Sequence, residues 1–98
     1  MSVRVTAECT VRADAVAQFL EIAKKIVEKT NALDKGCISY QMYRNVEDPL
    51  CCTMIEEWED RASLDAHLAA PHCDELLPQM NECCVENGVS VKIYEKAF

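Results

Sequence analysis

Hydrophobic and polar residues alternate at the start of the chain. Between residues 3 and 11, valine, alanine and cysteine side chains occupy the odd positions, and arginine, threonine and glutamate occupy the even ones. Successive side chains of a strand point to opposite faces of its sheet, so this alternation predicts a strand with one buried face. A helical period follows over residues 14–33, and Lys35 with Gly36 is expected to end that helix.

The remaining pattern predicts two more strands, a helix in two pieces and a final strand. In order, these elements cover residues 37–46, 51–59, 61–68, 72–86 and 89–95. A polar turn at residues 45–49 lies between the strands at 37–46 and 51–59. Its asparagine, aspartate and proline predict that these two strands form a hairpin. Pro71 divides the helix, and Asn87 with Gly88 is expected to close it. In the last strand, three residues are expected to face inward: Val89, Val91 and Ile93.

The order β-α-β-β-α-β predicts one domain over residues 1–98 with a ferredoxin-like α+β fold. Two β-α-β halves joined by a hairpin give an antiparallel sheet with the helices on one face. The bare face is expected to carry Arg4, Thr6, Glu8, Ser39, Gln41, Tyr43, Ser90, Lys92 and Tyr94. Because a chain of 98 residues buries a modest core, this face either meets water or pairs with a second copy.

Charge and composition exclude several partners. The formal net charge is −7, and no basic cluster exceeds the pair Lys24-Lys25. Nucleic acids and anionic membrane surfaces both select basic patches, so neither is expected as a partner. No apolar run approaches the roughly 18 residues of a membrane span, and residues 1–8 do not resemble a signal peptide. Seven cysteines, an odd number, therefore favour a cytoplasmic protein with reduced thiols.

Candidate functional side chains are most concentrated in residues 55–74, which contain the only tryptophan and both histidines. Trp58 comes near the end of a strand, and Asp60 can cap the following helix, which carries His67. Leu64 and Leu68 are expected to be buried, which puts His67 at the edge of their stripe. An aromatic wall beside an imidazole predicts a small pocket in which a proton can be moved.

The same stretch resembles a known family. A strand ending in Glu56-x-Trp58, the run E-D-x-x-S-L-D-x-H-L over residues 59–68, and the pair Pro71-His72 are similar to the antibiotic biosynthesis monooxygenase (ABM) domain. The strand order agrees over essentially the whole chain. The resemblance implies a homodimer whose sheets pack face to face as a barrel, with one pocket in each subunit. It also implies oxidation of phenolic or quinol-type aromatics by O₂ without metal or flavin. Haem-degrading relatives carry an asparagine on the first strand, which this chain lacks, so haem degradation is not expected.

His67 and Glu56 are the candidate catalytic residues. Cofactor-free oxygenation starts from a substrate anion, and an imidazole with an ordinary pKa of about 6.5 can accept the phenolic proton. Glu56 shares a strand face with Met54 and Trp58, and a buried carboxylate there would need a partner such as His67 or Arg44. That partner would hold the imidazole in one tautomer. The structural alternatives are a histidine bonded to a backbone carbonyl and a glutamate in solvent.

Trp58, Met54 and His72 are the candidate substrate-binding residues. Trp58 can stack on a planar substrate or anchor strand to helix, and His72 can face the pocket or cap its helix. No metal or other cofactor is expected, because the sequence has no C-x-x-C and no Gly-rich phosphate loop. His67 and His72, five apart across a proline, are not expected to share a helix face. Cys9, Cys37 and Cys84 are expected to pack in the core, and Cys73 is an alternative catalytic thiolate.

Three functions fit the sequence. The first is a cofactor-independent monooxygenase acting on a small aromatic or quinol with O₂. The second is a small isomerase or lyase handling a signalling or catabolic carbonyl compound, in which His67 would also move the protons. The third is a non-catalytic dimeric binding or stress-response module. An imidazole beside an aromatic wall favours the first two, because a pure binding module does not need it.

Overall fold

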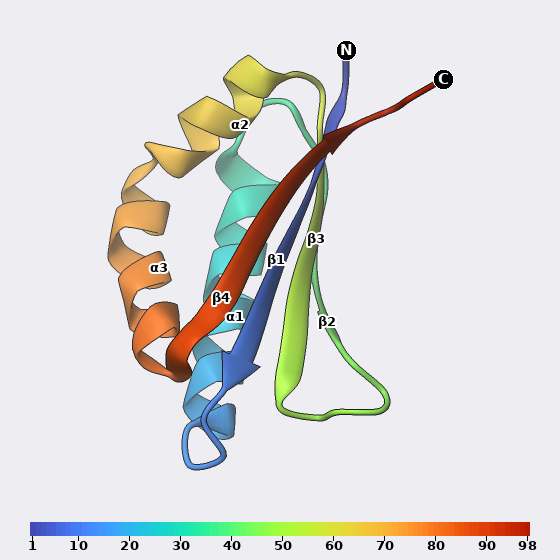
Figure 1. Ribbon diagram of the computed structural model, residues 1–98. Coiled ribbons are helices and arrows are strands. Elements are labelled where there is room, and N and C mark those ends of the chain that lie inside the picture. The colour runs from blue at the N-terminus through green and yellow to red at the C-terminus, as the bar shows by residue number, and fades with distance from the viewer.

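The computed structural model describes residues 1–98 as a four-stranded antiparallel sheet with three helices on one of its faces (Figure 1). The elements are β1 (Val3–Val11), α1 (Val16–Leu33), β2 (Cys37–Arg44), β3 (Cys51–Trp58), α2 (Arg61–Leu68), α3 (Pro71–Glu82) and β4 (Cys84–Glu95). The predicted ferredoxin-like α+β fold is confirmed. Both termini lie at the same end of the sheet as α2 (Figure 1).

The strand order is β2-β3-β1-β4, so the first and third strands in sequence are central and β4 is an edge strand. The register is what positions the site. Val5 on β1 lies opposite Glu56 on β3 and opposite Ile93 on β4. Glu56 in turn lies opposite Tyr40 on β2. Directly opposite residues point to the same face of a sheet, so this row presents all four side chains toward the helices.

The core lies between the sheet and the helices. Its largest fully buried side chains include Phe19 and Ile26 from α1, Tyr40 and Trp58 from the sheet, and Leu64 from α2. These residues follow the two periods read from the sequence, since strands contribute alternate positions and helices one apolar stripe. The predicted end of α1 is also confirmed, because Gly36 follows it with a φ of 79°, a left-handed conformation that glycine adopts without strain.

Two predicted boundaries are wrong by about four residues or more. The third helix ends at Glu82 rather than near residue 86, and the last strand begins at Cys84 rather than at residue 89. The reason is long-range, because Cys84 pairs with Val11 at the end of β1 and so leaves the helix. Asn87 does not close a helix. It has a φ of 58° inside β4, where the register with β1 shifts.

The apolar side of β4 is only partly covered. Val89, Val91 and Ile93 point toward the helical side, as predicted, but they stay 40%, 59% and 42% exposed. Leu68, which was expected to be buried, is 49% exposed, whereas Leu64 is 2% exposed. The prediction for Leu68 is wrong because α2 ends at that residue, so its side chain reaches the rim of a cavity rather than the core.

The opposite face of the sheet carries no helix (Figure 1). Tyr43 and Tyr94, both expected on that face, are 53% and 49% exposed. None of the helices has the length and apolar character that crossing a membrane requires.

Candidate functional site

His67 is packed inside the fold. Asp60 caps α2 as predicted, since its carboxylate accepts a hydrogen bond from the Ser63 backbone N–H at 2.8 Å. The cap fixes the start of the helix close to the end of β3, and two turns later the His67 side chain is only 2% exposed. Its ring lies 4.7 Å from that of Trp58 and 5.1 Å from that of Tyr40, centroid to centroid. The predicted pairing of tryptophan and imidazole is therefore present.

Asp34 joins the two histidines. Its Oδ2 atom lies 2.6 Å from Nδ1 of His67 and 3.0 Å from Nε2 of His72. A carboxylate only accepts hydrogen bonds, so both of these ring nitrogens are donors. In the neutral form of His67, the proton is therefore on Nδ1 and the lone pair is on Nε2. Neither a backbone carbonyl nor Glu56, the partners considered from the sequence, holds this ring.

Burial favours the neutral form of His67. Its pKa is lowered because desolvation disfavours the imidazolium, and the hydrogen bond and charge of Asp34 only partly oppose this effect. A neutral imidazole with a free Nε2 can accept a proton near neutral pH. Asp34 would then stabilise the imidazolium that forms, because the negative charge lies in direct contact with the ring.

Glu56 is buried, not in solvent. It is 6% exposed, and the Trp58 indole Nε1–H donates a hydrogen bond to its Oε1 atom at 2.9 Å. The partners expected from the sequence, His67 and Arg44, are wrong, because the carboxylate is bonded instead to the indole two residues along the same strand face. Burial raises the pKa of Glu56 to about 7, and the Trp58 hydrogen bond only partly opposes the rise. Near neutral pH this side chain can therefore either donate or accept a proton.

A cavity of about 190 Å³ opens between the sheet and the helices, lined mostly by apolar residues. Three of the five sequence-predicted site residues line it: Met54, Glu56 and His67. The other two, Trp58 and His72, do not. Trp58 is completely buried behind Glu56 and His67, and His72 is 7% exposed beside Asp34. These two residues therefore reach the cavity only through their neighbours.

Three functional side chains were not found from the sequence: Asp34, Tyr40 and Asn81. Tyr40 and Asn81 line the cavity, and Tyr40 is 2% exposed. Burial raises the pKa of Tyr40, so its hydroxyl stays protonated and can donate a hydrogen bond. Of these three, only Tyr40 could have been found from the sequence pattern, because it is an aromatic residue on the inner face of a predicted strand. Nothing local distinguishes Asp34 from any polar residue after a helix.

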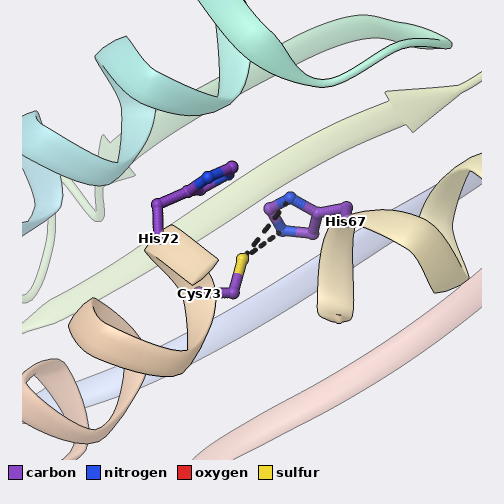
Figure 2. Close-up of side chains that lie close together, drawn as sticks. All are labelled: His67, His72 and Cys73. Atoms are coloured by element: carbon purple, nitrogen blue, oxygen red, sulfur yellow. Dashed lines mark hydrogen bonds between the residues drawn. The ribbon is translucent and has the colours of Figure 1, made fainter. Parts of the chain in front are cut away.

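His67, His72 and Cys73 form the one group that could hold a metal ion, with ligand atoms all within 4.8 Å of one another. Figure 2 shows His67 at the end of α2 and the other two side chains at the start of α3. As expected, the two histidines do not share a helix face, since His67 is on α2 and His72 is on α3, but their side chains still meet. The chain bends between the two helices, so residues on either side of the proline converge.

The geometry of this group does not match a metal centre. The Cys73 Sγ atom is nearly equidistant from the two ring nitrogens of His67, at 3.5 and 3.4 Å (Figure 2). At such distances a sulfur in the ring plane would overlap Cε1, so it lies over the face of the ring, away from both lone pairs. Burial also raises the pKa of Cys73 to about 12, whereas metals bind thiolates. Metal binding through all three residues would therefore require Cys73 to lose its proton and its sulfur to move off the ring face.

The fold and the site together define a small ferredoxin-like protein with a mostly apolar pocket and one imidazole at its wall. The family model for antibiotic biosynthesis monooxygenase matches residues 2–78. The chain therefore belongs to the antibiotic biosynthesis monooxygenase family, as the motif around Glu56, Trp58 and His67 indicated.

Solved structures agree with this assignment. The crystal structure of a conserved protein from Methanosarcina mazei Go1 is similar over 98% of this chain and 93% of its own, with a TM-score of 0.93 and 35% identity. The crystal structure of an antibiotic biosynthesis monooxygenase has a TM-score of 0.89 and 29% identity, over 97% of this chain and 98% of its own.

A curated relative is longer. The uncharacterised protein sll1783 of Synechocystis sp. is 26% identical over 87 residues, which make up 89% of this chain. The chain spans 58% of the length of that relative.

Proposed function

We propose that residues 1–98 act as one catalytic domain, a cofactor-independent monooxygenase that oxidises a small aromatic, quinol-type substrate with O₂. This proposal rests on the position of His67. The residue lines an apolar cavity, and its Nδ1 atom is 2.6 Å from Asp34 Oδ2. This bond leaves Nε2 as the proton acceptor. The family supports the reaction type, and the apolar lining supports a substrate with a hydrocarbon ring.

The first step is the transfer of a hydroxyl proton. Nε2 of His67 takes the proton of a substrate hydroxyl, and the resulting anion is electron-rich enough to react with O₂. One oxygen atom replaces a ring hydrogen, the O–O bond breaks, and the second atom leaves as water. For an unsubstituted hydroquinone, the products are hydroxyquinone and water. The substrate supplies the electrons, so the step balances without a flavin or a metal.

Glu56 is proposed to handle the second proton. With a pKa of about 7 and a place in the same cavity wall, it can exchange a proton with the substrate or with the water that forms. The Trp58 indole holds its Oε1 atom, so Trp58 positions Glu56 rather than contacting the substrate. Met54 packs against the ring, and His72 acts through Asp34.

Oxygen uptake tests the reaction. We expect the wild-type protein to consume O₂ with at least one member of a panel of hydroquinones, and His67→Gln to lose about 100-fold or more of kcat/KM. Asp65→Asn is the matched control, since Asp65 lies on the exposed side of the same helix and pairs only with Arg61. Turnover of carbonyl compounds without O₂ would instead support an isomerase or lyase. Binding without turnover of either kind would support a non-catalytic module.

A homodimer through the open face of the sheet is part of the proposal. Tyr43 and Tyr94 are about half exposed there, and a modest core gains stability when such a face is buried. We expect light scattering at micromolar concentration to give twice the monomer mass, and Tyr43→Glu with Tyr94→Glu to reduce it to the monomer mass. A wild-type monomer would overturn this part. We also place the protein in the cytoplasm, which its seven free thiols support.

A further inference from the structure

The cavity is longer than one aromatic ring. Its floor is made of three rows of paired side chains on β1 and β4: Val5 with Ile93, Ala7 with Val91, and Cys9 with Val89. A strand advances by about 3.3 Å per residue, so the four steps from Val5 to Cys9 span roughly 13 Å. Figure 1 shows these two strands side by side along their length, with α3 on the helical face of the sheet.

The two ends of the cavity differ in chemistry. The first row holds the ionisable end, because Val5 lies opposite Glu56, and Tyr40 and His67 line the same region. The third row lies opposite Cys52 on β3, and Leu77 and Asn81 line the cavity from later turns of α3. Between the two ends the rows are entirely apolar. A ring with its hydroxyl at His67 therefore leaves the rest of the floor without a partner.

The flank of this floor is open to solvent. Val91 in the middle row is 59% exposed, and Val89 and Ile93 in the outer rows are 40% and 42% exposed. Three aligned apolar side chains in water gain free energy when a hydrocarbon covers them. A linear chain suits the site because the floor is one strand pair wide. A bulky polycyclic substrate would extend past the edge of the sheet, because β4 is the last strand.

We propose that the substrate is amphiphilic: a phenol or quinol ring held at His67 and Glu56, with a linear hydrocarbon substituent lying along β4 toward Asn81. This inference rests on the proposed function for its ring end. The hydrocarbon end rests on the three apolar rows alone, so it can be tested separately.

A homologous series of alkyl-substituted phenols tests the hydrocarbon end without turnover. Trp58, the only tryptophan, lies 4.7 Å from the His67 ring, so its fluorescence reports occupancy of the ring end. From methyl to octyl, we expect the dissociation constant to fall by about two- to fourfold for each methylene, and then to level off. A dissociation constant that does not depend on chain length would overturn the proposal, even if quinols are oxidised.

A charged residue in the middle row gives a second test. Val91→Lys should reduce the ratio of octyl to methyl affinity by about 10-fold or more, because the chain would have to pass an ammonium group. Val46→Lys is the matched control, since Val46 lies in the hairpin and is 97% exposed. An unchanged ratio in Val91→Lys would overturn the proposal. Two results together would assign these rows to contact with a second copy of the chain. The wild type would show no dependence of affinity on alkyl chain length, and Val91→Lys would no longer form a dimer.

The two proposals can fail separately. If alkylphenols bind with the expected dependence on chain length but the protein consumes no O₂ with any quinol, the amphiphile site is supported and the oxygenase reaction is contradicted. If short quinols are oxidised and longer alkyl chains do not increase kcat/KM, the reaction is supported and the hydrocarbon site is contradicted.

Discussion

Asp34 and His67 lie 33 positions apart in sequence, yet the carboxylate Oδ2 and the imidazole Nδ1 are 2.6 Å apart. The same oxygen reaches His72 at 3.0 Å, so one side chain at the end of α1 fixes two rings across the corner between α2 and α3. The contact is largely buried, since Asp34 is 10% and His67 is 2% exposed. It fixes the tautomer of His67, and this makes Nε2 the proton acceptor.

The charge of Asp34 can be removed while its shape is kept. Asp34→Asn still offers an oxygen to Nδ1 but no negative charge, so the pKa of His67 should fall further below its usual range. We expect kcat/KM to drop by about 10-fold and the acidic limb of the pH profile to move to lower pH. NMR titration of the His67 ring measures the same shift directly. An unmoved profile would show that Asp34 is only structural.

Stability should respond to Glu56 in a defined pH window. Its pKa is raised from 4.5 to about 7, so the folded state binds more protons than the unfolded state between these values. The contribution of Glu56 to the free energy of unfolding is therefore fully present below pH 4.5 and is lost as the pH rises through 7. Glu56→Gln removes this loss and still accepts the Trp58 hydrogen bond. We expect the variant to be more stable than wild type at pH 8, by up to about 3 kcal/mol, with little difference at pH 5.

Urea denaturation at the two pH values checks this prediction. His67 acts in the opposite sense, because its pKa is lowered and its contribution is lost on acidification below its usual value. The double variant Glu56→Gln with His67→Gln controls for that effect. Equal stabilities of wild type and Glu56→Gln at pH 8 would contradict a raised pKa for Glu56.

The His67, His72 and Cys73 group should not form a tight thiolate–metal complex. The Cys73 thiol lies over the ring face of His67, and its pKa is raised to about 12, so deprotonation is costly. We expect titration with Co²⁺ at pH 7 to give no sulfur-to-cobalt charge-transfer band. A band present in the wild type and absent in Cys73→Ser would contradict this and establish a metal site.

The thiols should differ sharply in reactivity. Six of the seven cysteines are buried, and only Cys37 is half-buried. Burial raises the pKa of Cys9 and Cys73 to about 12, which suppresses their thiolates. We expect one fast thiol in the native protein with a disulfide reagent at pH 8, absent in Cys37→Ser, and seven thiols after denaturation without reductant. Fewer than seven in protein purified without oxygen would indicate a native disulfide.

The sequence by itself determined the features that depend on local geometry. Alternation with period two placed Glu56 and Trp58 on one face of β3, and this is why the indole can reach the carboxylate. The cap at Asp60 set the start of α2, and the helical period then put His67 next to Trp58. Each of these relationships spans ten residues or fewer, so backbone geometry alone carries it.

The tertiary structure decided the partners that come from distant segments. Asp34 meets His67 only because the end of α1 packs against the corner between α2 and α3. The start of β4 follows from the pairing of Cys84 with Val11, which overrides the helical pattern continuing past Glu82. Burial likewise set the state of Glu56, since its pKa rises through the loss of water around it, and the sequence carries no local measure of that loss.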